Sequence, residues 1–187
     1  MQTIIRVEKL NKTFNQHQVL HAIDLNVHAG EMVALLGPSG SGKSTLLRHL
    51  SGLIVGDKTP DCRVELLGKT VQQAGRLARD IRNSRAHTGY IFQQFNLLPF
   101  LSVQDNVTAA LTFSPAKRAR LKGSPEQEAR RLLGELQLPA EALHRPVHAL
   151  SIGQQQRVAA ARALIGSPPL VIADEPTSAL DTDNRAA

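Results

Sequence analysis

Cysteine, tryptophan, tyrosine and long apolar runs are scarce in this chain of 187 residues, and each scarcity narrows what the protein can be. Cys62 is the single cysteine, so no disulfide can form within the chain, as suits a reducing compartment. The longest uncharged apolar run, residues 32–36, is far too short to cross a bilayer. Residues 1–6 contain no basic segment followed by an apolar one, so the sequence indicates no secretory signal. The length fits one α/β domain of ordinary size.

Positive charge exceeds negative charge, with a formal net charge of +6, and the excess is uneven along the sequence. Arginine recurs at every third residue from Arg76 to Arg85, and residues 117–122 hold a second basic cluster. No helix-turn-helix, zinc or RNA-binding pattern accompanies these clusters, and aromatic residues for base stacking make up only 3% of the chain. We therefore favour a solvated face, or a surface near anionic lipid, and expect no nucleic-acid partner.

A glycine-rich loop at residues 37–44, G-P-S-G-S-G-K-S, is the most informative motif. The apolar residues 33–36 predict a buried strand before it, and residues 45–50 predict a helix after it, which is the context of a phosphate-binding loop rather than of a chance turn. Backbone N–H groups and the helix N-terminus can hold phosphates, Lys43 adds a charge, and the Ser44 hydroxyl can ligate Mg²⁺. The motif predicts binding of a nucleoside triphosphate, with contacts from Gly37, Pro38, Ser39, Gly40, Ser41, Gly42, Lys43, Ser44 and Thr45.

The hydrophobic pattern predicts strands at residues 4–10, 19–27, 63–67 and 88–92, and a helix at residues 76–85. Ser102 is expected to cap a helix that runs to about residue 111. Ser124 and Ser151 each stand three residues before a glutamine, the spacing of a capping box, so further helices are expected through residue 136 and over residues 158–165. Residues 94–165 should therefore be mainly helical and lie between two parts that contain strands.

A further apolar strand is predicted from Leu170, and it ends in two carboxylates, Asp174 and Glu175. In enzymes with a phosphate loop, an aspartate at such a strand end holds Mg²⁺, directly or through water, and a following carboxylate can polarise the attacking water. Acidic residues at a strand end are often only solvated turn residues. Because a phosphate loop lies upstream in the same chain, we favour the catalytic interpretation.

Residues 150–157, L-S-I-G-Q-Q-Q-R, resemble the signature motif of ATP-binding-cassette (ABC) proteins. Gln93 resembles the Q-loop glutamine of that family, and residues 178–181 resemble its D-loop. Phe14 stands where the family has an aromatic residue that stacks on adenine, although it could also be a core residue. Together with the phosphate loop and the two carboxylates, these motifs run in the family's order along nearly the whole chain, which makes the resemblance specific.

The resemblance implies an α/β fold: a P-loop NTPase (RecA-like) core with an N-terminal antiparallel β subdomain and an inserted helical subdomain. Residues 1–93 and 166–187 would form the nucleotide-binding core of a single ABC ATPase domain, and residues 94–165 the helical subdomain with the signature. The implied cofactors are ATP and Mg²⁺. The implied catalytic residues are Glu175, Gln93 and Lys43, and the implied metal ligands are Ser44, Gln93 and Asp174. In the family, the signature (here Ser151, Gly153 and Gln154) closes on the γ-phosphate bound by the opposite cassette.

Two features depart from the family pattern. Ile152 occupies the first glycine of the usual L-S-G-G-Q sequence, and its β-branched side chain restricts the backbone there. Ser151 and Gly153 keep a hydroxyl and one flexible backbone donor, so we expect the anion site to be retained. The family's switch histidine follows one further helix and strand, and all seven histidines of this chain precede Asp174. We therefore expect weak ATP binding, and hydrolysis at least about a hundredfold slower than in a chain extended through that histidine.

Resemblance within the family is mixed. Residues 1–98 are most similar to the ATPase subunits of phosphonate importers, whereas residues 150–156 and 159–168 are more like the cassettes of lipoprotein-release and macrolide exporters. We favour an ATPase subunit peripheral to the cytoplasmic face of the inner membrane that drives phosphonate import. The expected partners are a second copy or a paired cassette, transmembrane permease subunits and a periplasmic binding protein. The alternatives are an exporter cassette, a soluble ABC protein of translation or DNA repair, and a nucleotide-binding fragment with little turnover.

Overall fold

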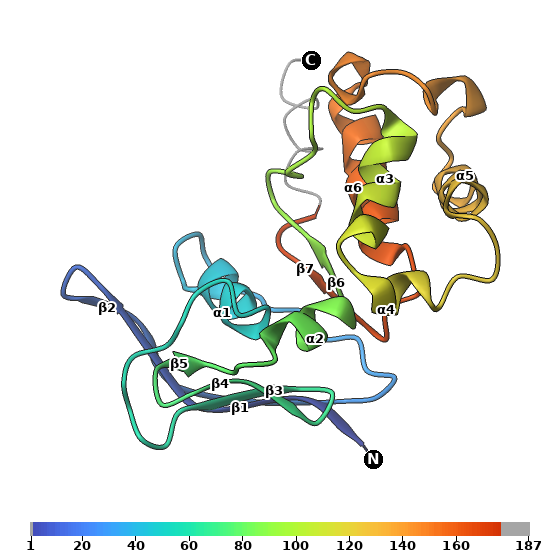
Figure 1. The fold of residues 1–187 in the computed structure, drawn as a ribbon. Helices are drawn as coiled ribbons and strands as arrows, with labels where there is room; N and C mark the ends of the chain where they lie inside the picture. The colour runs from blue at the N-terminus through green and yellow to red at the C-terminus, as the bar shows by residue number, and fades with distance from the viewer. Residues whose placement is uncertain (1, 177–187) are drawn as a thin grey trace. The chain divides into compact units, whose positions relative to one another are not determined.

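The structure, a computed structural model, describes residues 2–176, which divide into two compact units (Figure 1). The first unit ends at Arg85 and the second begins at Ala86. The phosphate loop belongs to the first unit, and the Q-loop glutamine, the signature and the two carboxylates belong to the second. The predicted D-loop, residues 178–181, lies outside the described residues. Among residues 2–176 no helix is both long enough and apolar enough to span a membrane.

An antiparallel sheet of five strands, in the order β2-β1-β3-β4-β5, forms the framework of the first unit. Its strands are β1 (Thr3–Phe14), β2 (His17–His28), β3 (Arg63–Leu66), β4 (Lys69–Gln73) and β5 (Arg76–Leu77). The β1–β2 hairpin turns at Asn15 and Gln16, both with left-handed φ angles of 46° and 67°. The strands predicted at residues 4–10, 19–27 and 63–67 and the antiparallel β subdomain are confirmed.

A bulge at Lys9 explains how β1 keeps its apolar side chains on one face. Ile5 and Val7 are buried, and strict alternation would place Lys9 in the core next. Instead, the pairing with β2 shifts between Val7 and Leu10, and Lys9 adopts a φ of 43°. The extra residue turns Leu10 into the core, where it is fully buried, and leaves the charged Lys9 side chain at the surface.

Helix α1 (Lys43–Leu50) contacts β2 and β3 and buries Leu46 and Leu50. Gln72 on β4 is buried beside it, where its amide donates to the His49 carbonyl at 2.9 Å and accepts from the Gly56 N–H at 2.7 Å. The helix that follows the phosphate loop is therefore fixed to the sheet by both apolar packing and a buried hydrogen-bonded side chain. This connection holds the loop at the N-terminus of α1 in place.

Two local predictions for the first unit are wrong. Residues 33–36 form no strand: Val33 and Leu36 are 50% and 91% exposed, and the segment pairs with no strand of its own unit. An apolar run favours a strand only where a partner strand can accept its backbone hydrogen bonds. Residues 76–85 are not one helix, because left-handed residues Ala74 and Gly75 reverse the chain so that β5 pairs with β4. Helix α2 (Ile81–Ala86) begins only afterwards.

The second unit combines two parallel strands with a group of helices. Strand β6 (Thr88–Ile91) pairs with β7 (Leu170–Ala173), and α3 and α6 pack side by side (Figure 1). The helices are α3 (Val103–Thr112), α4 (Pro115–Arg118), α5 (Pro125–Glu135) and α6 (Ile152–Leu164), with 3₁₀ turns η1 (Ala140–Ala142) and η2 (Val147–Ala149). Val103, Val107, Leu133, Val158 and Ile165 lie in their common core. The predicted strands at 88–92 and from Leu170 and the helical content of residues 94–165 are confirmed.

Serine side chains define where three of these helices begin, as the sequence predicts. The Ser102 hydroxyl accepts from the Asp105 N–H at 3.1 Å. Ser124 and Ser151 each form a complete capping box with the glutamine three residues later, Gln127 and Gln154. Each box satisfies two backbone donors that the first helical turn leaves without an intrahelical partner.

His49 generates a pH prediction for the first unit. Its side chain is fully buried on α1, its Nδ1 lies 2.7 Å from the Thr45 carbonyl, and burial lowers the pKa of its imidazole below the usual 6.5. A lowered pKa means that the unfolded chain binds the proton more readily, so stability is complete above about pH 6.5 and falls as the pH drops toward the folded pKa. We expect the melting temperature to fall more steeply between about pH 7.5 and 5.5 in the wild type than in His49→Gln. The exposed His17→Gln serves as the control and should keep the wild-type slope; equal slopes for all three proteins would contradict the prediction.

Candidate functional site

Three glycines give the phosphate loop its conformation. Gly37, Gly40 and Gly42 have φ angles of 152°, 80° and 91°, a region that side chains with a Cβ rarely adopt. Gly42 is the N-cap of α1, and a Cβ there would lie 2.9 Å from a Leu20 methyl group. As a glycine, Gly42 makes no side-chain cap hydrogen bond, unlike Ser151 at the start of α6. An exposed glycine-rich loop at a helix N-terminus suits the β- and γ-phosphates of a nucleotide.

Lys43 lies over this loop. Its Nζ donates to the carbonyl oxygens of Gly37 and Pro38, each at 2.9 Å. The ammonium group is therefore held at the mouth of the loop by the loop's own backbone. A phosphate oxygen that enters the loop can replace these neutral acceptors with a charged one, and a charge-assisted hydrogen bond is the stronger of the two.

Phe14 is 42% exposed at the end of β1, beside the hairpin turn, so it is not a core residue. The Lys12 ammonium lies 4.9 Å from the centre of its ring, within the range of a cation–π contact. The same ammonium donates to the Val55 carbonyl at 2.8 Å, which fixes its position. One face of the ring thus has a cation partner, and an aromatic ring in such a setting offers a stacking surface for a base. The role of Phe14 in adenine binding stays a prediction.

The parallel pairing of β6 and β7 brings Gln93 to Glu175. The ladder ends at Ile91 and Ala173, and the Asp174 N–H extends it by donating to the Ile91 carbonyl at 2.9 Å. Two residues beyond β6, the Gln93 amide Nε2 donates to the Glu175 carboxylate at 3.0 Å. The predicted catalytic pair therefore meets within the second unit.

Asp174 and Glu175 differ in environment. Asp174 is 3% exposed, whereas Glu175 is partly exposed. Glu175 also has a left-handed φ of 45°, which is uncommon for a residue other than glycine and clusters at functional sites. Carboxylate and amide oxygens are ligands that Mg²⁺ prefers, so the Asp174 carboxylate and the amide oxygen of Gln93, whose Nε2 lies 3.0 Å from Glu175, are groups whose chemistry fits this ion.

The signature residues stand at the N-terminus of α6. The Ser151 Oγ accepts from the Gln154 N–H at 3.3 Å, and the Gln154 side-chain oxygen accepts from the Ser151 N–H at 3.0 Å. Ile152, the residue that departs from the family pattern, is the first residue of the helix and is 45% exposed. Its side chain thus points away from the helix core and leaves the cap of Ser151 and Gln154 complete, with Gly153 following in the first turn.

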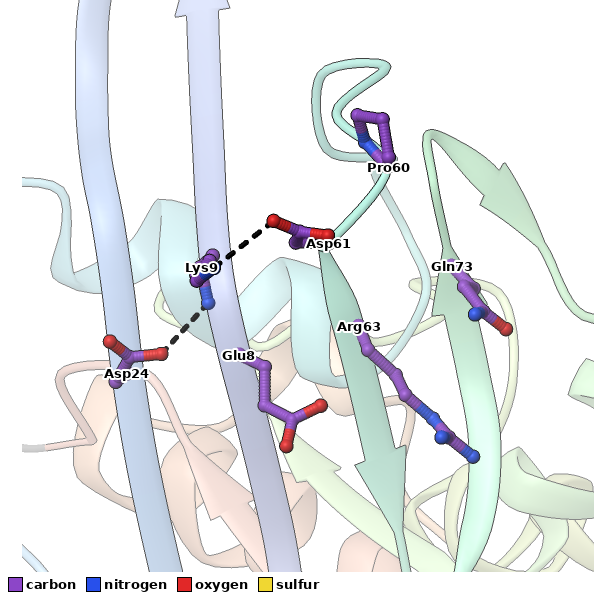
Figure 2. A pocket seen from close by; sticks show the side chains of 7 residues that line it. All are labelled: Glu8, Lys9, Asp24, Pro60, Asp61, Arg63 and Gln73. Atoms are coloured by element: carbon purple, nitrogen blue, oxygen red, sulfur yellow. Dashed lines mark hydrogen bonds and ion pairs between the residues drawn. The ribbon is translucent and has the colours of Figure 1, made fainter.

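A hollow of about 530 Å³ lies on the outer surface of the first unit's sheet, and none of the predicted site residues lines it (Figure 2). Lys9 is one of its lining residues and lies between Asp24 and Asp61: its Nζ lies 3.0 Å from the Asp61 carboxylate, and its backbone N–H donates to Asp24 at 2.8 Å. The other lining residues are Glu8, Pro60, Arg63 and Gln73. Exposed charges of both signs that already pair with one another give no indication of a bound ligand.

Sequence reasoning missed two polar residues that support the site. Asn106 on α3 is fully buried, and its amide group donates to the carbonyls of Leu98 and Ser102 and accepts from the Leu98 N–H. Arg162 on α6 donates to the carbonyls of Phe95 and Asn96. Both hold the segment between Gln93 and α3. The available signal was a polar or charged residue inside an apolar helical pattern, which is costly to bury unless it is hydrogen-bonded.

Comparison with known proteins gives a consistent result. The model of the ABC transporter family matches residues 20–178. A phosphonates import ATP-binding protein PhnC from Shigella dysenteriae serotype 1 (strain Sd197) is 64% identical over 187 residues, which cover 98% of this chain and 71% of that protein. The protein of the same name from Escherichia coli (strain K12) is 62% identical over 188 residues, with the same coverage of both chains.

A solved structure shows the same fold. The dimeric, post-hydrolysis state of the ATP-binding cassette MJ0796, bound to ADP and Pi, matches with a TM-score of 0.79 and 34% identity over 96% of this chain and 77% of that one. The chain therefore belongs to the ABC transporter family. The predicted fold, a P-loop NTPase cassette with an N-terminal antiparallel sheet, is confirmed, and so is the prediction of an ABC-type ATPase.

The position of Lys43 generates a prediction about nucleotide affinity. Lys43→Ala removes the ammonium from the mouth of the loop, and a hydrogen bond to a charged group contributes about 1.5–3 kcal/mol. We expect ATP affinity to fall at least about tenfold, as measured by titration with a fluorescent ATP analogue. Lys69→Ala, which removes an exposed lysine from β4 of the same unit, is the matched control and should bind like the wild type. Unchanged affinity in Lys43→Ala would contradict the assignment of the phosphate loop.

Proposed function

We propose that this chain is the ATP-binding and hydrolysing subunit of a phosphonate importer. The observation that carries the proposal is 64% identity to a phosphonate-import ATP-binding protein over 98% of the chain. The matched region includes residues 150–168, the part whose sequence pattern also resembles exporter cassettes, so the comparison favours import over export. The phosphate loop, Gln93 and the Asp174–Glu175 pair support ATP hydrolysis as the energy source.

In the proposed reaction, the first unit binds the nucleotide. The N–H groups at the start of α1 and the Lys43 ammonium hold the β- and γ-phosphates, and Phe14 stacks on adenine. The Ser44 hydroxyl on α1 and the Asp174 carboxylate at the end of β7 are the residues that would hold Mg²⁺. This ion, when bound, neutralises charge that develops on the transferred phosphoryl group.

Glu175 and Gln93 orient the attacking water in this proposal. Glu175 follows the buried Asp174 directly, and its carboxylate accepts a hydrogen bond from the Gln93 amide at 3.0 Å. The Glu175 carboxylate is the group that would accept a hydrogen bond from the attacking water.

Assembly follows from the position of the signature. Ser151 and Gly153 lie at the N-terminus of α6, where backbone N–H groups and the helix dipole favour an anion. We propose that this end closes on the γ-phosphate bound by a second cassette, so that two copies enclose two nucleotides with twofold symmetry. Permease subunits in the inner membrane, joined on the outside by a periplasmic binding protein, would then hold the pair at the cytoplasmic face. In such an importer the substrate is recognised by the partner subunits, and this chain supplies the ATPase.

The shared site generates the first prediction for this function. Glu175→Gln keeps the side chain's size but removes the negative charge that polarises water, so ATP should bind and remain unhydrolysed. We expect dimers to accumulate in Mg-ATP, as measured by sedimentation velocity. Glu135→Gln, an exposed glutamate at the end of α5, is the matched control and should hydrolyse ATP at the wild-type rate. Only monomers in Glu175→Gln with Mg-ATP would contradict the shared site.

Transport of phosphonates is tested separately. In a bacterium whose own phosphonate-import ATPase has been deleted, expression of this protein should raise uptake of radiolabelled methylphosphonate above the background of the deletion strain, and Lys43→Ala should return it to that background. Growth on inorganic phosphate provides the control for expression and viability. A wild-type protein that hydrolyses ATP in the same cells but restores no uptake would contradict phosphonate import and leave the ATPase assignment standing.

A further inference from the structure

A single guanidinium group holds the loop that carries Gln93. Arg162, near the end of α6, donates from Nη1 to the Asn96 carbonyl at 2.6 Å and from Nη2 to the Phe95 carbonyl. Phe95 and Asn96 are consecutive left-handed residues, with φ angles of 56° and 51°. Two residues in this conformation turn neighbouring carbonyls toward one side, and the planar fork of an arginine matches such a pair of acceptors.

The surroundings of Arg162 make this contact hard to replace. Arg162 is partly buried, and this burial lowers the pKa of its guanidinium. The carbonyl oxygens of Phe95 and Asn96 then supply the negative partial charge that solvent would otherwise provide. Both of these hydrogen bonds join Arg162 to the loop and not to its own helix, so their effect is to hold the loop.

Helix α6 itself is fixed against the strand that leads into this loop. A Cβ on Gly89, within β6, would lie 2.3 Å from the Ala163 carbonyl, so the backbones of β6 and α6 touch directly beside Arg162. From Gly89 the strand runs to Ile91, then to Gln93, and the chain meets Arg162 again at Phe95 and Asn96. The segment that carries Gln93 is thus held by α6 on both sides.

We propose that Arg162 is a positioning residue, which keeps Gln93 directed at Glu175 by binding the two carbonyls that follow it. This inference rests on the proposed function, in which Gln93 and Glu175 act on Mg²⁺ and water. Because Ser151 lies at the other end of α6, the same helix connects the signature to the Gln93 loop. A movement of α6 is therefore passed to Gln93 through Arg162.

The test compares two arginine-to-lysine substitutions. Arg162→Lys keeps the charge but loses the fork, so one of the two carbonyls is left without its donor. Arg120→Lys is the matched control. Arg120 also donates to two carbonyls of the second unit, Gly166 at 2.6 Å and Ala86 at 2.8 Å, but these precede β7 and β6, at the opposite ends of the strands from Gln93. Each variant loses a contact with two carbonyls, but only Arg162→Lys loses it at the loop that carries Gln93.

Amide hydrogen exchange of residues 92–97 is the first measurement, because it does not depend on catalysis. We expect exchange there to be about tenfold faster or more in Arg162→Lys, and unchanged in Arg120→Lys. Unchanged exchange in Arg162→Lys, or an equal increase in both variants, would contradict the proposal that Arg162 holds this loop.

Steady-state ATP turnover of Gln93→Ala, Arg162→Lys and the double variant is the second measurement. A positioning partner in the outer shell of a metal site typically contributes a factor of about 10–100, so we expect a kcat loss of that size with little change in KM for Arg162→Lys. If Arg162 acts through Gln93, the double variant should be no slower than Gln93→Ala alone. Multiplied losses would overturn the positioning role, whereas equal turnover of wild type and Gln93→Ala would overturn the proposed role of Gln93 itself.

Discussion

The parallel pairing of β6 with β7 is the constraint on which the second unit depends. Parallel strands end at the same edge of a sheet, so residues far apart in sequence leave that edge together. The register Ile91–Ala173 sets Gln93 and Glu175 at equal distances beyond the ladder, and their side chains meet at 3.0 Å. A shift by one residue would turn Asp174 out of its buried position and separate the pair. Helix packing favours the same register, because α6 packs against β6 at Gly89 so closely that no side chain would fit there.

In the first unit, the constraint acts on the phosphate loop, which must keep one conformation although Gly42, the N-cap of the helix that follows it, makes no side-chain cap hydrogen bond. Its glycines have backbone angles that other residues avoid, and the adjoining α1 is held to the sheet by Leu46, Leu50 and the buried Gln72. The Lys43 ammonium closes the loop on itself through two carbonyls. Preorganisation of this kind lowers the cost of ordering the loop when an anion binds.

Much of this arrangement could be predicted from the sequence, because the relevant signals are local. The serine caps of α3, α5 and α6, the hairpin strands and the strand that leads to Asp174 all follow from short patterns whose physics involves neighbouring residues. Predictions from the sequence were wrong where the local structure depends on contacts between residues that are far apart in the chain. Residues 33–36 are apolar but unpaired within their unit, and arginines spaced by three at residues 76–85 conceal a chain reversal at Ala74 and Gly75. The hydrogen bonds of Arg162 and Asn106 join segments up to 67 residues apart, and no local pattern encodes them.

The capping box at Ser151 has a consequence for what α6 can recognise. A serine hydroxyl has one proton and two lone pairs, and here the Gln154 N–H already occupies a lone pair at 3.3 Å. The hydroxyl keeps its proton to donate and a second lone pair to accept. Together with the N–H groups of the first turn, it gives this end of the helix more donors than acceptors. An incoming group rich in acceptors, such as an oxyanion, is therefore favoured here over an amine, and this preference requires no charged side chain.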